Sequence, residues 1–161
     1  MLTLNLLGSV QVLLNQQPIT RWPTDKVCAL LIYLALERRP HPRSAVAAFL
    51  WPGYSPESAA NSLRVALHQL RQTIGDAAVT PPWLRITRQT LELNSDANVQ
   101  VDVVTFNDLL VACSHHPHPQ LTQCADCLAR LRQAATLYHG DFLAGFAVDD
   151  SAPFEIGRAH V

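Results

Sequence analysis

The hydrophobic residues between Pro56 and Gly75 recur at the spacing of an amphipathic α-helix. Four of them would form one buried stripe: Leu63, Leu67, Leu70 and Ile74. Proline is favoured in the first turn of a helix and glycine just after its end. We therefore predict one long helix that runs from Pro56 to about Ile74.

Two further helices are predicted before Trp51. Thr24 can cap a helix from Asp25 to about Glu37, and the apolar face of that helix would hold Val27, Leu30, Leu31 and Leu34. Ser44 can cap a short helix that ends near Leu50, where the sequence Trp-Pro-Gly follows.

The N-terminal segment has the composition of a small antiparallel sheet. Residues 2–14 are rich in strand-forming residues and are interrupted by Gly8-Ser9, which predicts two short strands. Residues 15–18 have the composition of a turn, and a third strand would begin at Ile19-Thr20.

Residues 81–93 alternate apolar and polar side chains around a short polar segment, which predicts a β-hairpin. Arg85 and Arg88 would lie on or near its tip. One face would hold Leu84, Ile86, Leu91 and Leu93. Residues 94–98 have the composition of a linker.

A different pattern begins at Val99. Asp102 can cap a helix with an apolar face of Val103, Phe106, Leu109, Leu110 and Cys113. A second helix, from Leu121 to about Tyr138, would bury Leu128, Leu131, Ala135 and Tyr138. Two helices that cannot bury both faces alone suggest the start of a helical-repeat array.

The order of these elements predicts a mainly α fold with small β-sheets. Three helices followed by a basic hairpin are typical of a winged helix-turn-helix, here preceded by N-terminal strands and spanning residues 1–96. Residues 99–154 would be the start of an all-α domain similar to tetratricopeptide repeats.

The distribution of charge agrees with two modules. Residues 1–98 hold nine Lys or Arg and six Asp or Glu, a balance of +3, whereas residues 99–161 hold three and seven, a balance of −4. The sequence has neither an apolar run of the length of a membrane span nor a signal peptide. We therefore expect a cytoplasmic protein without a membrane partner.

The outer face of the long helix is suited to DNA. It carries amide, imidazole and guanidinium groups and no carboxylate: Asn61, Val65, His68, Gln69 and Gln72, flanked by Arg64 and Arg71. Amides and imidazoles can read base edges in a major groove, and guanidinium groups can bind phosphates. An ordinary solvated helix face remains an alternative for this helix taken alone.

Several motifs, in this order, resemble those of the SARP-type bacterial transcriptional regulators. The matching strings are KVCALLIYLAL, SAVAAFLWP, SPESAANSLRVALHQLRQTIG, VDVVTF and LYHGDFLAGF. The resemblance covers nearly all of residues 2–154. It implies an OmpR-like winged helix followed by a bacterial transcriptional activator domain of tetratricopeptide-like helices. It also implies dimers on promoter direct repeats, with RNA polymerase as a further partner.

The resemblance assigns the DNA-contacting residues one by one. The groove-facing part of the recognition helix would be Asn61, Ser62, Arg64, Val65, His68 and Gln69. Arg71 and Gln72 fall where contacts to the DNA backbone are expected, and Arg85 and Arg88 fall on the wing. This helix has two Arg where many members of the family have three or more.

The end of the chain departs from this family. After Pro153-Phe154-Glu155 relatives usually continue with a Trp-containing helix, whereas this chain ends in EIGRAHV. That string matches the conceptual translation of a common sequencing-library adapter. We therefore expect residues 155–161 to be a non-native tail and the activator domain to be truncated.

Six potential metal ligands lie between positions 113 and 127, and Cys124 and Cys127 have metal-ligand spacing. We hypothesise a structural zinc site built from Cys113, Cys124 and Cys127 with His116 or His118 as the fourth ligand. Two alternatives stay open. The cysteines could be small core residues, or they could form a redox switch, although the sequence shows no basic neighbour that would lower a thiol pKa.

No catalytic motif is present. The sequence lacks GxxxxGK[ST], GxSxG and HExxH, and we expect neither an enzyme nor a required cofactor. The main alternative to a DNA-binding regulator is a protein-interaction module whose winged helix no longer binds DNA. Arg64, Arg71, Arg85 and Arg88 on one continuous face would favour DNA binding, and interruption of that face by Glu57 and Glu92 would favour the alternative.

Overall fold

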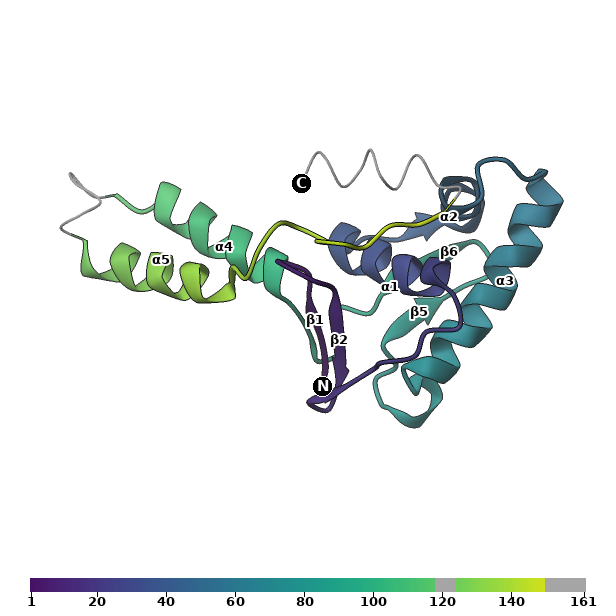
Figure 1. The fold of residues 1–161 in the computed structure, drawn as a ribbon, viewed down its shortest axis with the longest axis horizontal. Coiled ribbons are helices and arrows are strands. Elements are labelled where there is room, and N and C mark those ends of the chain that lie inside the picture. Colours follow the sequence, from purple (N-terminus) through teal and green to yellow (C-terminus); the bar gives the residue numbers. More distant parts are fainter. Residues whose placement is uncertain (118–123, 150–161) are drawn as a thin grey trace.

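The computed structural model describes residues 1–117 and 124–149, which form five α-helices, one short 3-10 helix and seven short strands (Figure 1). This agrees with the predicted combination of helices and small sheets. Predictions for His118, for the start of the last helix at Leu121 and for the tail at 155–161 lie outside the described residues. Within the described ranges, no helix combines the length and the apolar composition that a membrane span requires.

Three helices and a small sheet form one half of the molecule, called here the α1–α3 body. The helices are α1 (Asp25–Glu37), α2 (Arg43–Leu50) and α3 (Pro56–Thr73). The sheet has the strand order β4-β6-β5, with bounds β4 (His41–Pro42), β5 (Leu84–Ile86) and β6 (Thr90–Leu93). The short 3-10 helix η1 (Asp76–Ala78) joins α3 to this sheet.

The predicted hydrophobic faces are confirmed in this body. All four residues of the α3 stripe are at most 4% exposed, and so are the four residues predicted for α1. Ser55 caps α3 by accepting a hydrogen bond from the Ser58 amide, and Gly75 follows its end with a φ of 64°. Glycine adopts this left-handed conformation without the steric cost that a Cβ would add.

The predicted cap of α2 is wrong. The cap position is Pro42, which makes no side-chain cap bond, so the helix begins at Arg43, two residues earlier than a cap at Ser44 would give. The reason is a tertiary contact: β4 pairs with β6, and the Arg43 amide donates to the Gln89 carbonyl at 2.8 Å. The hairpin turn thus satisfies the amide of the first residue of the helix.

A second sheet with the strand order β3-β2-β1-β7 lies beside this body (Figure 1). Its strands are β1 (Leu2–Asn5), β2 (Gln11–Leu14), β3 (Gln17–Pro18) and β7 (Val99–Val101). The antiparallel pair β1–β2 confirms the prediction. The third strand begins two residues earlier than predicted, because Asn15 and Gln16 both have positive φ and form a two-residue turn after which pairing resumes at once.

Strand β7 was not predicted. It pairs in parallel with β1, with Leu2 opposite Val99, although the two strands are almost a hundred residues apart in the sequence. Three residues are too few to show a period, so only the free edge of β1 makes this segment a strand. The first residues of the predicted second domain therefore pair with the N-terminal sheet. The division into domains 1–96 and 99–154 stays a prediction.

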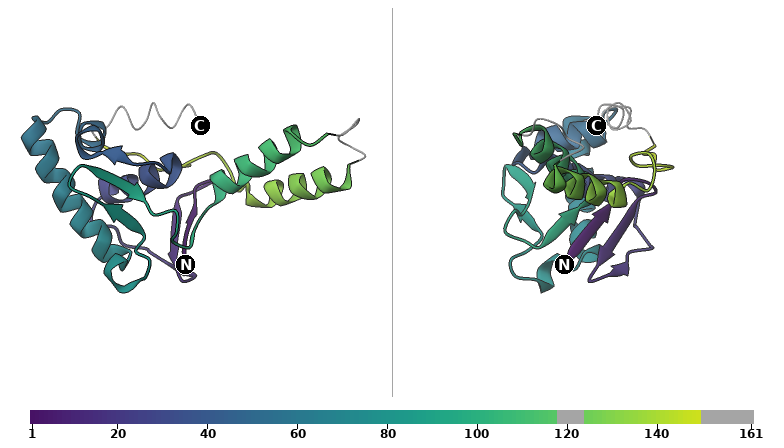
Figure 2. Two further views of the ribbon diagram at one scale, coloured as in Figure 1. Left: turned by 180° about the vertical axis from the view of Figure 1, so that it is seen from behind. Right: turned by 90° about the vertical axis from the view of Figure 1, so that its left-hand side faces the viewer.

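Helices α4 (Asp102–Ser114) and α5 (Ala125–Leu137) pack against each other and project away from the rest of the molecule (Figures 1 and 2). We call them the α4–α5 pair. Asp102 does not act as the predicted cap; it is the first residue of α4 and is buried. Its Oδ2 accepts hydrogen bonds from the Leu6 and Leu7 amides at 2.7 and 2.8 Å, so it fastens α4 to the end of β1.

The predicted buried stripe of α5 is also partly wrong. Ala135 and Tyr138 are exposed, and Cys127 and Ala134 are buried in their place, whereas Leu128 and Leu131 are partly buried. The helix is rotated so that its small side chains face α4. Small residues allow two helices to approach closely, and nothing in the local pattern distinguishes that face from the neighbouring one.

The chain then returns along the N-terminal strands. Isolated bridges join Leu7 to Phe142 and Ser9 to Ala144, and Leu143 is buried in the core. The apolar segment that begins at Phe142 is therefore an extended cover over the first residues of the chain rather than a helix.

Candidate nucleic-acid interface

The outer face of α3 is solvent-accessible over the whole predicted groove-facing segment. Asn61, Arg64, Val65, His68 and Gln72 are exposed, and Ser62 and Gln69 are half-buried. Val65 is 49% exposed, a large fraction for an apolar side chain in the middle of a helix. The 18-residue helix holds one carboxylate, Glu57, and it lies in the first turn. The segment from Asn61 to Gln72 thus presents polar and cationic groups without an acid.

Arg64 lies in the centre of this face. Its Nη2 donates to Oδ1 of Asn61, one helical turn earlier. No ion pair neutralises Arg64 within the part of the chain that the structure describes. Its positive charge is therefore available to an anion.

Arg71 has a different environment. Its Nε lies 2.8 Å from Oδ2 of Asp76, a carboxylate that is only 1% exposed. The second oxygen of Asp76 accepts a hydrogen bond from the Leu84 amide at 3.0 Å. Arg71 thus balances a buried charge that joins the end of α3 to the hairpin, although half of its side chain is exposed.

The two arginines of the hairpin also differ. Arg85 lies in β5 before the turn, and its guanidinium contacts Glu92 at 3.2 Å and both Asn94 and Asp96 at 3.0 Å. One cation between two carboxylates leaves a local excess of negative charge. Arg88 is exposed in the turn itself and makes no ion pair among the described residues.

The turn that carries Arg88 is well organised. The Thr87 hydroxyl accepts hydrogen bonds from the Gln89 amide at 3.1 Å and from the Thr90 amide at 2.8 Å. Such side chain to backbone bonds are typical of tight turns, and they fix where the Arg88 backbone lies.

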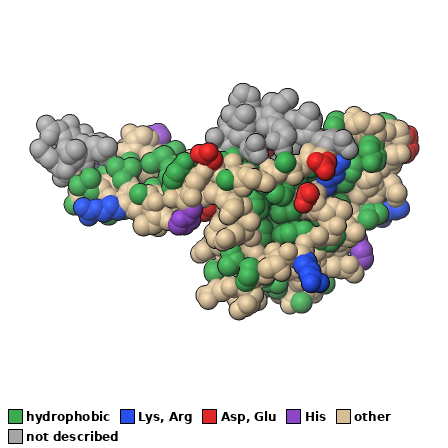
Figure 3. Space-filling model, viewed as in Figure 1, with side chains coloured by type: hydrophobic (Ala, Val, Ile, Leu, Met, Phe, Trp, Pro, Cys, Tyr) green, Lys and Arg blue, Asp and Glu red, His purple; other side chains and the backbone are tan. Residues whose placement is uncertain are grey.

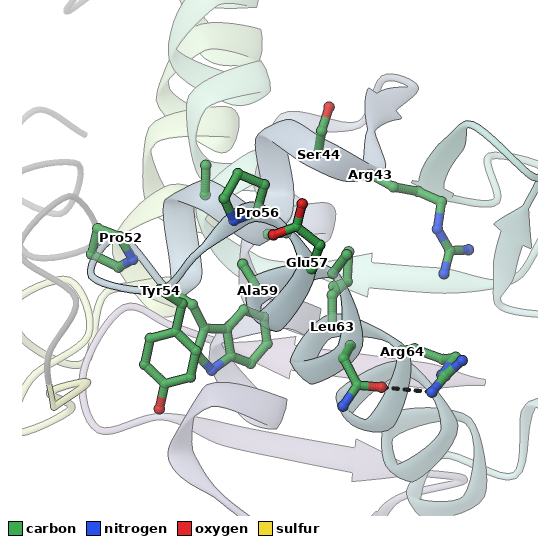
Figure 4. Close-up of a pocket in the computed structure, with 14 residues that line it drawn as sticks. Arg43, Ser44, Pro52, Tyr54, Pro56, Glu57, Ala59, Leu63 and Arg64 are labelled. Atoms are coloured by element: carbon green, nitrogen blue, oxygen red, sulfur yellow. Dashed lines mark hydrogen bonds between the residues drawn. The ribbon is translucent and has the colours of Figure 1, made fainter.

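Arg43 is a cation that the sequence did not assign to this surface. It begins α2, and its Nη1 lies 3.4 Å from the Thr87 carbonyl oxygen of the hairpin turn. Arg43 and Arg64 both line a cavity of about 620 Å³ between α2 and α3, which Glu57 also lines (Figure 4). The sequence could have indicated this cation only through the position of Arg43, directly after the predicted break between two helices.

The set of unpaired arginines on this surface differs from the predicted set of Arg64, Arg71, Arg85 and Arg88. Glu92 does neutralise Arg85, and Asp76 neutralises Arg71, whereas Arg43 joins Arg64 and Arg88 as a cation without a carboxylate partner among the described residues. Basic groups are dispersed rather than gathered into one patch on the face seen in Figure 3. What remains is a helix face with few charges and many hydrogen-bonding groups.

The predicted metal ligands come together at the far end of the α4–α5 pair. His116, Cys124 and Cys127 have ligand atoms that all lie within 4.8 Å of one another. Cys113 is buried beside them but is not a member of this group, so its role as a ligand stays a prediction. Burial, with hydrogen bonds to Cys124 and Cys113, raises the pKa of the Cys127 thiol to about 11.

The thiols do have a basic neighbour. The sequence showed no basic neighbour, but Nη1 of Arg130, one turn further along α5, lies 3.9 Å from the Cys127 sulfur. The raised pKa of Cys127 nevertheless keeps this thiol protonated at neutral pH, which is unlike the low-pKa thiols of redox-active CxxC motifs.

No protein-family model matches the sequence, and no curated protein matches it significantly. A solved structure, that of Mycobacterium tuberculosis EmbR in complex with a low-affinity phosphopeptide, has a similar fold with a TM-score of 0.76 and 23% sequence identity. The similarity covers 99% of this chain and 41% of the EmbR chain, so this chain spans less than half the length of that protein. At this identity the likeness concerns the fold.

Proposed function

We propose that this chain is a sequence-specific DNA-binding transcriptional regulator built on a winged helix-turn-helix. Helix α3 would lie in the major groove, and the β5–β6 hairpin would place Arg88 on the neighbouring phosphates. The exposed, carboxylate-free face from Asn61 to Gln72 is the observation that carries the proposal. The fold similarity to EmbR and the sequence resemblance to SARP-type regulators support it.

We assign different roles to the candidate residues. Asn61 and His68 would hydrogen-bond to base edges, Val65 could contact a thymine methyl group, and Gln72 would contact the DNA backbone. Arg43, Arg64 and Arg88 would bind phosphates, because their charges are not neutralised by carboxylates of the described residues. Arg71 and Arg85 would chiefly hold the helix and hairpin in register. Catalytic activity is not part of the proposal.

The finer parts of the proposal come from the family resemblance. We infer that the α4–α5 pair begins a tetratricopeptide-like activator domain, that dimers bind promoter direct repeats, and that RNA polymerase is the partner in activation. The exposed apolar residues Leu110 and Val111 of α4 agree with a helix that further helices would cover.

The test is fluorescence anisotropy on random-sequence duplex DNA at low and moderate salt. The test compares Arg64→Ala with Arg132→Ala. Both substitutions remove one exposed arginine, but Arg132 lies in α5, at the opposite end of the molecule from α3. Arg64→Ala should weaken binding and reduce the slope of log affinity against log salt by about 0.9, the value for one phosphate contact. Equal effects of the two substitutions would contradict the assignment of the DNA face to α3.

A second candidate is a protein-interaction module that does not bind DNA. The ion pairs of Arg71 and Arg85 favour it, because they remove two of the four predicted cations from the face. Absence of salt-sensitive binding at low salt, by a chain with native circular dichroism, would support this candidate instead.

A further inference from the structure

Two pairs of metal-ligand residue types face each other where α4 ends and α5 begins. Cys113 and His116 are three positions apart at the end of α4, and Cys124 and Cys127 are three positions apart at the start of α5. Residues at this spacing in a helical turn lie on one side of the chain. The packing of α4 on α5 brings the two pairs together.

The distances within the cluster match a coordination sphere. Nδ1 of His116 lies 3.4 Å from the sulfur of Cys124 and 3.4 Å from the sulfur of Cys127. A tetrahedral zinc ion with Zn–N of about 2.0 Å and Zn–S of about 2.3 Å separates nitrogen and sulfur ligands by roughly 3.5 Å. The two nitrogen-to-sulfur distances therefore match such a site, and all three donor atoms lie within 4.8 Å of one another.

The chemistry of the donor set selects the class of metal. Two thiols and one imidazole are soft or borderline ligands, and no carboxylate oxygen belongs to the group among the described residues. Calcium and magnesium prefer oxygen ligands, whereas zinc prefers this combination of sulfur and nitrogen.

Cys113 is the natural fourth ligand. It is buried, and its thiol donates a weak hydrogen bond to the Cys127 carbonyl oxygen at 3.6 Å, so it lies next to the group and would have to turn towards it to bind the metal. Three thiolates on one divalent ion leave a net charge of −1, and the guanidinium of Arg130, 3.9 Å from the Cys127 sulfur, would balance it.

We propose that His116, Cys124 and Cys127, completed by Cys113, bind one Zn²⁺ ion that fastens the end of α4 to the start of α5. The site is structural: four protein ligands leave no open position for a substrate. Its free energy of binding would add to the stability of a helix pair that buries few large apolar residues. This inference does not depend on DNA binding.

The experiment uses the full chain, purified without a polyhistidine tag and kept reduced. Elemental analysis measures bound zinc, and titration with Co²⁺ after zinc removal measures thiolate-to-metal charge transfer and the visible bands of tetrahedral Co²⁺. The wild type should hold one zinc per chain and show both sets of bands. Zinc removal should lower its thermal midpoint.

The matched control is the neighbouring histidine. His115 is exposed, and its Nδ1 lies 2.9 Å from the Val111 carbonyl oxygen of its own helix, away from the thiols. His115→Ala should therefore keep zinc, whereas His116→Ala and Cys124→Ser should lose stoichiometric binding. Cys113→Ser should reduce the charge-transfer intensity by about one third, because one of three thiolates is lost.

Two results would overturn the proposal. One is a reduced, folded wild type that takes up neither zinc nor Co²⁺. The other is loss of metal by His115→Ala to the same extent as by His116→Ala. The wild-type result decides the matter even if a ligand variant fails to fold. An internal disulfide formed in air, without metal binding in the reduced state, would favour a redox role instead.

Discussion

The α1–α3 body and the α4–α5 pair are stabilised in different ways. In the body, large aliphatic side chains such as Leu63, Leu70 and Leu91 are at most 1% exposed. Within the described residues of α4 and α5, the buried apolar side chains other than Val103 are small, namely Cys113, Cys127 and Ala134, while Val111 is 54% exposed. The body has a large hydrophobic core that it shares with the N-terminal sheet, whereas the pair is fastened by Asp102 at one end and by the proposed metal at the other.

The same comparison explains where function is expected. A rigid core holds α3 and the hairpin in fixed register, so that the polar groups on the outer face of α3 keep their spacing. The pair keeps an apolar surface available for further helices or partners. The predictions below test this contrast between a body held by its core and a pair held at its ends.

The largest expected effect is in the core of the body. Leu70→Ala removes a fully buried side chain of α3 and should lower the free energy of unfolding by about 3 kcal/mol. Leu110→Ala, on the exposed face of α4, should change it by about 0.5 kcal/mol or less. Urea denaturation measures both. Similar losses for the two variants would show that the pair has a core comparable to that of the body.

A smaller effect is expected at the junction between the two regions. Asp102→Asn keeps the shape of the side chain but can present an amide N–H towards the Leu6 and Leu7 amides, which donate to Oδ2 in the wild type. Loss of these charge-assisted bonds should cost about 2 kcal/mol. The control is Asp108→Asn, an exposed carboxylate on the same helix. If the two variants unfold at the same urea concentration, Asp102 does not fasten α4 to β1.

The smallest effect is a pH dependence located in the body. Burial, assisted by the positive charge of Arg39, lowers the pKa of His41 below its ordinary value of 6.5. Its Nδ1 lies 3.1 Å from the Tyr33 hydroxyl, and its Nε2 has no hydrogen-bond partner among the described residues.

The sign follows from proton binding. Below about pH 6.5 the unfolded chain takes up a proton at His41 more readily than the folded chain, so stability is lost as pH falls. His41→Gln cannot titrate. The wild type should therefore lose stability relative to this variant between pH 7.5 and 5, as followed by urea midpoints. If the difference between the urea midpoints of the two proteins stays constant across this range, His41 is not the group that titrates.

A large part of the fold could be predicted from local sequence patterns. The helical period of Leu63, Leu67 and Leu70 lies within a few turns of one helix, and the bounds of α1 and α3 followed from Thr24, Pro56 and Gly75. The hairpin was predicted because its alternation is also local. By contrast, β7 and the buried face of α5 depend on a partner surface, and the α2 cap was displaced by a contact with the hairpin turn.

The candidate sites divide in the same way. The sequence by itself determined which groups α3 presents to solvent, because exposure on an amphipathic helix follows from its hydrophobic period. It also identified His116, Cys124 and Cys127 as candidate metal ligands through their residue types, and the packing of α4 on α5 brings them together. Only the tertiary structure decided which arginines keep an unneutralised charge. Arg71 and Arg85 are paired, and Arg43 joins the face, because ion pairing depends on distances through space that no period along the chain encodes.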